Sequence, residues 1–180
     1  MHTVRRNPDI AHFVHNNQVY GLTKGQASPT SEPGMVTETQ RAGVFNPPLN
    51  PLALALVLGA GFVARCYSGE TEHLQETMQK AIEFPGYALV DILHPCVSFN
   101  KLNTYSWYKE RVYKLENHDT TDWQAALGGA MEWGDKIPLG VFYAVPRTTF
   151  EESLSTLKGA PLATRPFDPS TLTHIQDAYT

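Results

Sequence analysis

The sequence predicts an α/β fold with a mostly parallel sheet flanked by helices. Runs with the pattern of strands alternate along the chain with runs that have the pattern of helices, which is typical of a layered α/β domain. The run Tyr87–Leu93 is almost continuously apolar, as strands buried on both faces of a parallel sheet tend to be. With 180 residues, of which 42% are apolar, the chain is also long enough to enclose its own core.

Hydrophobic periodicity and end signals assign the individual elements. Met1–Asn7 has the pattern of the end of a helix, which Pro8 would stop. The segment 119–122 has the pattern of a helix start. The predicted strands are Ile10–His15, Phe62–Arg65, Tyr87–Leu93 and Leu139–Val145. The predicted helices are Leu52–Leu58, Thr71–Phe84 and Trp123–Trp133.

Two segments lack a periodic pattern. Thr30–Pro51 is long and rich in Pro, Gly, Thr and Asn, which in a compact domain indicates a functional loop or a contact between subunits. The proline-spaced stretch 158–180 is expected to be an extended C-terminal tail, which leaves a domain at residues 1–157. Because no strand precedes the helix end at Met1–Asn7, we expect this domain to be partial and to lack its opening elements.

Charge, hydropathy and cysteine usage indicate which partners and which cellular location to expect. The net charge of -4 and the absence of any block of Lys or Arg argue against nucleic acid as a partner. The most apolar run, Pro51–Ala64, is shorter than the roughly 20 residues that a membrane span needs. The two cysteines, Cys66 and Cys96, form neither a Cys-x-x-Cys motif nor a disulfide framework, and no secretory signal is recognisable. We therefore expect a cytoplasmic protein.

The polar stretch His15–Ser31 follows the first predicted strand. In open parallel sheets, ligands bind just outside the carboxyl ends of the strands, which is where this stretch begins. An Asn side chain and a carbonyl two residues later can fill two neighbouring positions of an octahedral Mg²⁺ shell, and Asn17 and the backbone of Val19 have this spacing. The alternative is that Asn16 and Asn17 merely cap a turn, for which Asn is well suited.

The whole string from His15 to Thr30, HNNQVYGLTKGQASPT, carries a family resemblance. It resembles the thiamine-diphosphate-binding β subunit of the 2-oxoacid:ferredoxin oxidoreductases, most closely the 2-oxoglutarate and broad-specificity members. The resemblance continues through Gly69 and Asp91 and covers nearly everything from Met1 to about Glu152. Further matching segments are 95–100, 103–113 and 137–143.

The resemblance implies a thiamine-diphosphate-binding fold that lacks its N-terminal part. A side-chain Mg²⁺ ligand of the family falls on Asn17 and a carbonyl ligand on Val19. The family's Gly-Asp-Gly motif, whose aspartate is the other protein ligand to Mg²⁺, would lie upstream of this chain. The resemblance assigns no catalytic residue. The positions that line the cofactor fall on Tyr20, Gly21, Leu22 and Thr23, and Gly25 and Gln26 would shape the loop.

Cys96 has two possible roles. By its chemistry alone, one cysteine after a buried strand is a small apolar filler. The resemblance instead places it at the fourth ligand of a [4Fe-4S] cluster, whose other three ligands lie near the family's N-terminus. A four-iron cluster needs four ligands, and Cys66 matches no ligand position. We therefore expect Cys96 to bind a cluster only in a completed subunit.

By resemblance, the complete enzyme decarboxylates a 2-oxoacid oxidatively, forms an acyl-coenzyme A and passes electrons to ferredoxin. The implied partners are the α subunit, ferredoxin and the missing N-terminal part of the β subunit, and the isolated chain should be inactive. One alternative is a non-catalytic remnant or assembly module that keeps the fold without binding cofactor. Another is a different thiamine enzyme, such as an acetolactate-type decarboxylase, which the segment 95–100 disfavours.

Two further groups of residues are interpreted as structural. His12 and His15 would point to opposite faces of a strand, so they have no metal-ligand spacing. The aromatic and charged segment 107–111 could stack on a base, but the acidic balance favours packing.

Overall fold

The computed structural model describes residues 1–166, 170, 173 and 177–179. The chain divides into two compact units, Met1–Phe150 and Glu151–Thr180. The described part of the second unit contains two short 3-10 helices, Ser155–Leu157 and Leu162–Thr164. The tail predicted at residues 158–180 falls within this unit, partly outside the described residues.

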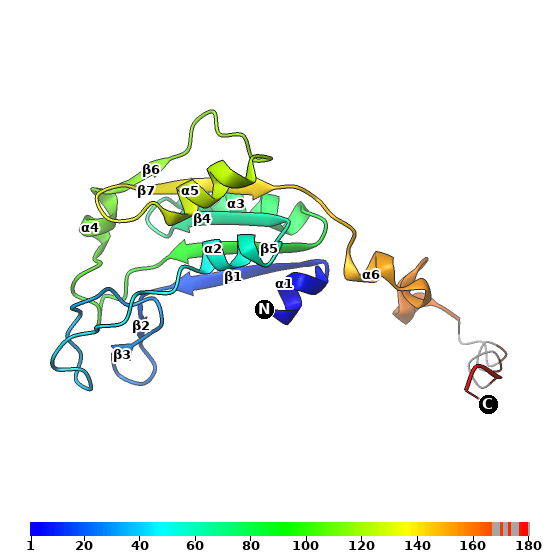
Figure 1. The fold of residues 1–180 in the computed structure, drawn as a ribbon, viewed down its shortest axis with the longest axis horizontal. Coiled ribbons are helices and arrows are strands. Elements are labelled where there is room, and N and C mark those ends of the chain that lie inside the picture. Colours follow the sequence, from blue (N-terminus) through cyan, green and yellow to red (C-terminus); the bar gives the residue numbers. More distant parts are fainter. Residues whose placement is uncertain (167–169, 171–172, 174–176, 180) are drawn as a thin grey trace. The chain divides into compact units, whose positions relative to one another are not determined.

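The first unit is built on a five-stranded sheet with the order β1-β5-β4-β7-β6 (Figure 1). Three of the four strand pairs are parallel, and β4 and β7 form the antiparallel pair. This arrangement confirms the predicted α/β fold with a mostly parallel sheet. The strands are β1 (Ile10–Asn16), β4 (Phe62–Tyr67), β5 (Tyr87–Leu93), β6 (Val112–Lys114) and β7 (Ile137–Ala144).

Helices cover both faces of the sheet. Leu52 and Leu56 of α2 and Ala126 of α5 share one buried cluster with Val63 and Leu89 of the sheet. On the opposite face, α3 packs through Ala81 against β4 and β5. In the first unit, the helices are α1 (His2–Arg6), α2 (Pro51–Val57), α3 (Thr71–Glu83), α4 (Tyr105–Lys109) and α5 (Trp123–Met131). The short helix α6 (Phe150–Ser153) lies at the boundary between the two units.

The ends of several elements agree with local sequence signals. Strand β5 has the predicted bounds, and α5 begins after Asp122, whose side chain accepts hydrogen bonds from the backbone of Gln124 and Ala125. Helix α1 ends at Asn7, before Pro8, as expected. The segment between Ala27 and Pro51 contains no helix or strand in the structure, all of it within the described residues.

Sequence patterns missed the shortest elements. Strand β6 has only three residues, all of them at least partly exposed, so no hydrophobic periodicity marks it. Helix α4 spans five residues and follows its N-cap residue Thr104, whose side chain accepts a hydrogen bond from the backbone N–H of Trp107. Strand β7 begins two residues earlier than predicted and includes Pro138. The proline is tolerated because the residues of β7 that pair with β4 begin only at Gly140.

The apolar run that begins at Pro51 forms α2, a short turn and the start of β4, which are largely buried. This agrees with the predicted helix Leu52–Leu58 and the predicted strand Phe62–Arg65. None of the helices in the described part of the chain is both long and apolar enough to cross a membrane.

Candidate functional site

A small hairpin follows the carboxyl end of β1. Its strands, β2 (Val19–Tyr20) and β3 (Gln26–Ala27), pair antiparallel and enclose a turn at residues 21–25. The backbone N–H of Gly25 donates to the carbonyl oxygen of Tyr20 over 2.9 Å, which closes the turn. Gly25 has a φ of 92°, a conformation that glycine adopts without strain. The predicted cofactor residues therefore lie on one short, well-defined loop.

Asn17 lies at the start of this hairpin. Its side-chain Oδ1 accepts a hydrogen bond from the backbone N–H of Val19 over 3.2 Å. This is the local turn expected of an Asn, and it brings the Asn17 side chain close to the Val19 backbone. The two oxygens expected to bind Mg²⁺ come from residues two positions apart in one turn. Both are of the type that Mg²⁺ prefers, and they could supply at most two of its six ligands.

The backbone of Asn17 is held by a buried amide. Asn100 Nδ2 donates to the carbonyl oxygen of Asn17 over 3.3 Å, while Asn100 Oδ1 accepts from the backbone N–H of Leu102 and of Asn103, each over 3.0 Å. Asn100 and Asn103 are both buried. In the sequence, Asn100 is only one member of a matching segment, and no role was predicted for it. Its contact with Asn17 spans 83 positions, so no local signal could have revealed it.

The residues predicted to line the cofactor differ in exposure. Val19 is buried, Gly21 is half-buried and Thr23 is exposed. Tyr20 is 51% exposed and Leu22 is 99% exposed. The structure therefore places all of them on the same hairpin, but it does not gather their side chains into one cavity. The apolar side chain of Leu22 would be covered only by something outside the described part of this chain.

Cys96 packs against the hairpin. Its half-buried side chain packs against the cluster formed by Val19, Met35 and Val44. Its contact with Val19 places Cys96 at the same end of the sheet as the hairpin. The packing also satisfies the simpler interpretation of Cys96 as an apolar filler.

Cys66 occupies a different part of the molecule. It is buried within β4 against α3, and burial raises the pKa of its thiol to about 11. The two cysteines do not come together, so the residues of this chain do not fit a four-cysteine iron–sulfur cluster. Among the described residues, there is also no group of three His, Cys, Asp or Glu side chains that could hold a metal ion.

The aromatic segment 107–111 packs within the chain. Tyr108 is buried, and its ring centroid lies 4.9 Å from that of Trp107. The guanidinium of Arg111 stacks over the Trp107 ring at 4.6 Å, and Trp133 contacts the same cluster. These contacts agree with the packing interpretation. The Tyr108 hydroxyl also donates to Gln18 Oε1 over 3.3 Å, which connects this cluster to the start of the hairpin.

The two histidines of β1 make separate contacts. His12 Nδ1 lies 2.7 Å from the hydroxyl of Tyr87, whereas His15 Nδ1 lies 3.1 Å from His94 Nδ1. Their contacts differ as expected for residues three apart in a strand.

Two family models together match most of the chain. The model described as "Thiamine pyrophosphate enzyme, C-terminal TPP binding domain" matches residues 1–92, which include the hairpin. The model for the C-terminal part of the pyruvate ferredoxin oxidoreductase beta subunit matches residues 96–159, beginning at Cys96.

Individual relatives indicate the same family. The chain is 43% identical over 166 residues to the β subunit of 2-oxoacid:ferredoxin oxidoreductase 1 from Aeropyrum pernix, covering 84% of this chain and 52% of that protein. It is 44% identical over 100 residues to the 2-oxoglutarate oxidoreductase subunit KorB of Mycobacterium tuberculosis, covering 56% of this chain and 27% of that protein.

The fold also matches a solved structure. This is the 2-oxoglutarate:ferredoxin oxidoreductase from Magnetococcus marinus with 2-oxoglutarate, coenzyme A and succinyl-CoA bound, with a TM-score of 0.85 and 34% identity. The match covers 97% of this chain and 60% of that one. The chain spans about half the length of the curated relatives it matches. On the match of both family models and of these relatives, the chain belongs to the β-subunit family of the 2-oxoacid:ferredoxin oxidoreductases.

Proposed function

We propose that this chain contributes to the thiamine diphosphate and Mg²⁺ site of a 2-oxoacid:ferredoxin oxidoreductase. The complete enzyme would convert a 2-oxoacid, of the 2-oxoglutarate or pyruvate type, and coenzyme A into acyl-coenzyme A and carbon dioxide, with electrons passed to ferredoxin. The observation that carries the proposal is the turn of Asn17 and Val19 at the carboxyl end of β1, within the region that matches the thiamine pyrophosphate model.

The proposed roles of the residues rest on the family resemblance, and the residues lie at the start of the hairpin and on it. Asn17 Oδ1 and the carbonyl oxygen of Val19 would hold Mg²⁺, which in turn would bind the diphosphate. Tyr20, Gly21, Leu22 and Thr23 would line the cofactor. When bound, thiamine diphosphate supplies the electron sink for loss of carbon dioxide from the 2-oxoacid. The contribution of this chain is to fix the diphosphate end and to exclude water beside it.

We propose three partners: the α subunit, ferredoxin and the N-terminal part of the β subunit. Several apolar side chains on the loops beyond β1 and β5 are exposed, and burying them against a partner would be favourable, which supports a contact there. Figure 1 shows the loops of residues 20–50 projecting from this end of the first unit. The exposed apolar residues include Leu22, Val36 and Phe45 on these loops and Val97 on the loop after β5.

Calorimetric titration with thiamine diphosphate in the presence of Mg²⁺ tests the proposal. The isolated chain should bind weakly or not at all, because Asn17 and Val19 provide only two of the six ligands. Co-expression with the α subunit and with the N-terminal half of a β subunit such as that of Aeropyrum pernix should restore tight, stoichiometric binding. In that complex Asn17→Ala should weaken binding, whereas Gln124→Ala, an exposed change on α5, should not. Tight binding by the isolated chain would contradict the expectation that two ligands are too few, and undiminished binding by Asn17→Ala in the complex would contradict the proposed role of Asn17.

The cysteines favour one second candidate, a non-catalytic remnant or assembly module. The sequence has two cysteines, and Cys66 is buried on the α3 face away from Cys96. In the completed complex, anaerobic iron and sulfide should yield a cluster absorption that Cys96→Ser weakens and Cys66→Ser leaves unchanged. If the complex assembles but binds neither thiamine diphosphate nor iron, the assembly module is the correct function.

A further inference from the structure

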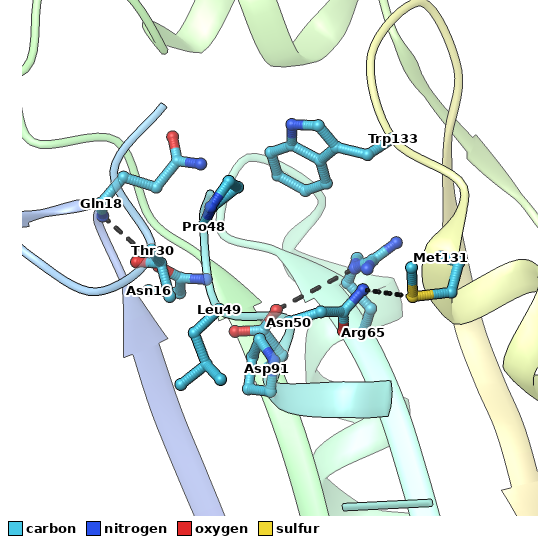
Figure 2. Close-up of a pocket in the computed structure, with 11 residues that line it drawn as sticks. Asn16, Gln18, Thr30, Pro48, Leu49, Asn50, Arg65, Asp91, Met131 and Trp133 are labelled. Atoms are coloured by element: carbon cyan, nitrogen blue, oxygen red, sulfur yellow. Dashed lines mark hydrogen bonds and ion pairs between the residues drawn. The ribbon is translucent and has the colours of Figure 1, made fainter. Parts of the chain in front are cut away.

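A pocket of about 290 Å³ lies beside the end of β1, on the face of the sheet that α2 and α5 cover (Figure 2). Its lining combines polar side chains, such as Asn16 and Thr30, with apolar ones, such as Leu49, Met131 and Trp133. The Thr30 hydroxyl donates to Asn16 Oδ1 over 2.7 Å, which leaves the Asn16 NH₂ group to act on the Asp91 carboxylate. The proposed cofactor residue Asn17 does not line this pocket.

Arg65 and Asp91 form the charged part of the pocket. They are register partners on the neighbouring parallel strands β4 and β5, and each side chain is only 2% exposed. Arg65 Nε lies 4.0 Å from Asp91 Oδ2, which makes an ion pair but is too long for a hydrogen bond. Within the described residues, Arg65 Nε and Asp91 Oδ1 have no hydrogen-bond partner. Figure 2 shows the two side chains facing each other at the pocket.

The rest of the Arg65 guanidinium is occupied. Its Nη2 donates to the carbonyl oxygen of Ala130 over 2.9 Å, and its central carbon lies 5.5 Å from the ring centroids of both Trp133 and Phe142. The carboxylate of Asp91 compensates the remaining charge. Arg65 Nε and Asp91 Oδ1 thus remain as one buried donor and one buried acceptor without a hydrogen-bond partner among the described residues, and the ion pair leaves no excess of either charge.

We infer that this pocket binds a small neutral primary carboxamide that carries a short apolar substituent. Its carbonyl oxygen would accept from Arg65 Nε, its NH₂ group would donate to Asp91 Oδ1, and its alkyl part would contact Leu49 and Met131. A buried donor and a buried acceptor without partners are both costly, so a ligand that satisfies both is favoured. A carboxylate would satisfy Arg65 but would bring a second negative charge against Asp91.

This inference does not depend on the proposed function, because neither Arg65 nor Asp91 belongs to the hairpin and the test needs no thiamine diphosphate. The full ¹⁵N-labelled chain would be titrated at pH 7.5 with isobutyramide and, separately, with its carboxylate analogue isobutyrate. The indole N–H resonance of Trp133, assigned with Trp133→Phe, reports on the pocket. Isobutyramide should shift it saturably, with a dissociation constant on the order of 1 mM for so small a ligand.

Isobutyrate should bind at least roughly tenfold more weakly than isobutyramide. Asp91→Asn should reduce the ratio of carboxamide to carboxylate affinity by at least roughly tenfold, because Arg65 then lacks its compensating charge. Equal binding of the two ligands by the wild-type chain, no binding of either, or an unchanged ratio in Asp91→Asn would overturn the inference.

A second variant tests the inferred binding site without altering Arg65 or Asp91. Leu49 is 47% exposed, so Leu49→Trp should fill the pocket while leaving the Arg65–Asp91 pair and the fold intact. This variant should lose the carboxamide shift, and Gln124→Ala should keep it. Retained binding in Leu49→Trp would place the ligand elsewhere and refute the assignment, even if Asp91→Asn fails to fold.

Discussion

The ring of Phe99 occupies the space that a side chain on Gly25 would need. A Cβ atom on Gly25 would lie 2.8 Å from Phe99 Cδ1, which is closer than real Cβ contacts allow. The turn of the hairpin is thus packed directly against the segment that follows Cys96. This contact fixes the proposed cofactor loop relative to the loop after β5, although the two are far apart in the sequence.

We predict that Gly25→Ala destabilises the chain by about 2 kcal/mol or more, because it combines a positive φ with a steric overlap. Gly59 provides a matched control, since its φ of +82° is similar but nothing lies within 4 Å of its added Cβ. Gly59→Ala should therefore cost only about 1 kcal/mol. Urea denaturation measures both free energies of unfolding. If both variants lose the same free energy of unfolding, the Phe99 side chain moves aside at little energetic cost.

Replacing Asn100 should affect both stability and cofactor binding. Asn100→Ala removes the hydrogen bond to the Asn17 carbonyl and leaves buried backbone groups without a partner, which should lower the free energy of unfolding by about 2 kcal/mol. Asn46→Ala, at an exposed position, should leave stability unchanged within about 0.5 kcal/mol. In the completed complex, Asn100→Ala should also weaken thiamine diphosphate binding. Normal binding in this variant would mean that Asn100 does not position Asn17.

The pH dependence of stability should report the burial of Asp91. Burial raises the pKa of Asp91 to about 6, although Arg65 and the Asn16 side chain oppose this shift. Between about pH 4 and pH 6, the unfolded chain has released this proton while the folded chain retains it. The Asp91 contribution to the free energy of unfolding therefore falls as the pH rises, by at most about 1.4 kcal/mol per pH unit.

Asp91→Asn removes this contribution, so the difference in slope between variant and wild type is the quantity to measure. Using the difference matters because burial lowers the pKa of His73, which makes stability rise with pH in the acidic range. Asp135→Asn, at an exposed position, is the matched control and should keep the wild-type slope. If Asp91→Asn also keeps that slope, Asp91 titrates normally in the folded chain.

The two thiols should differ in reactivity. The thiolate is the reactive form of cysteine, and Cys66 is buried with its pKa raised to about 11, whereas Cys96 is half-buried. A chromogenic disulfide reagent at pH 8 should therefore modify one thiol of the folded chain quickly and the other only after unfolding. Cys96→Ser should remove the fast phase, and Cys66→Ser should leave it. The reverse result would show that the α3 face of the sheet opens readily.

Much of the architecture could be predicted from local patterns. The continuous apolar run of β5, the Asp122 cap of α5 and the stop at Asn7 before Pro8 each result from neighbouring residues, so the sequence alone places them. The short elements β6 and α4 could not be placed in this way. Strand β6 depends on its pairing with β7, and α4 is stabilised by burial of Tyr108 in the aromatic cluster.

In the candidate site, too, local features could be predicted from the sequence and long-range contacts could not. The turn of Asn17 and Val19 is local, so its residues could be named from the sequence and from the resemblance of the surrounding string. The support from Asn100, the packing of Phe99 on Gly25 and the pairing of Arg65 with Asp91 could not be foreseen. Each joins residues 26 or more positions apart, and such contacts exist only once parallel strand pairing has set the register and burial has removed water from between them.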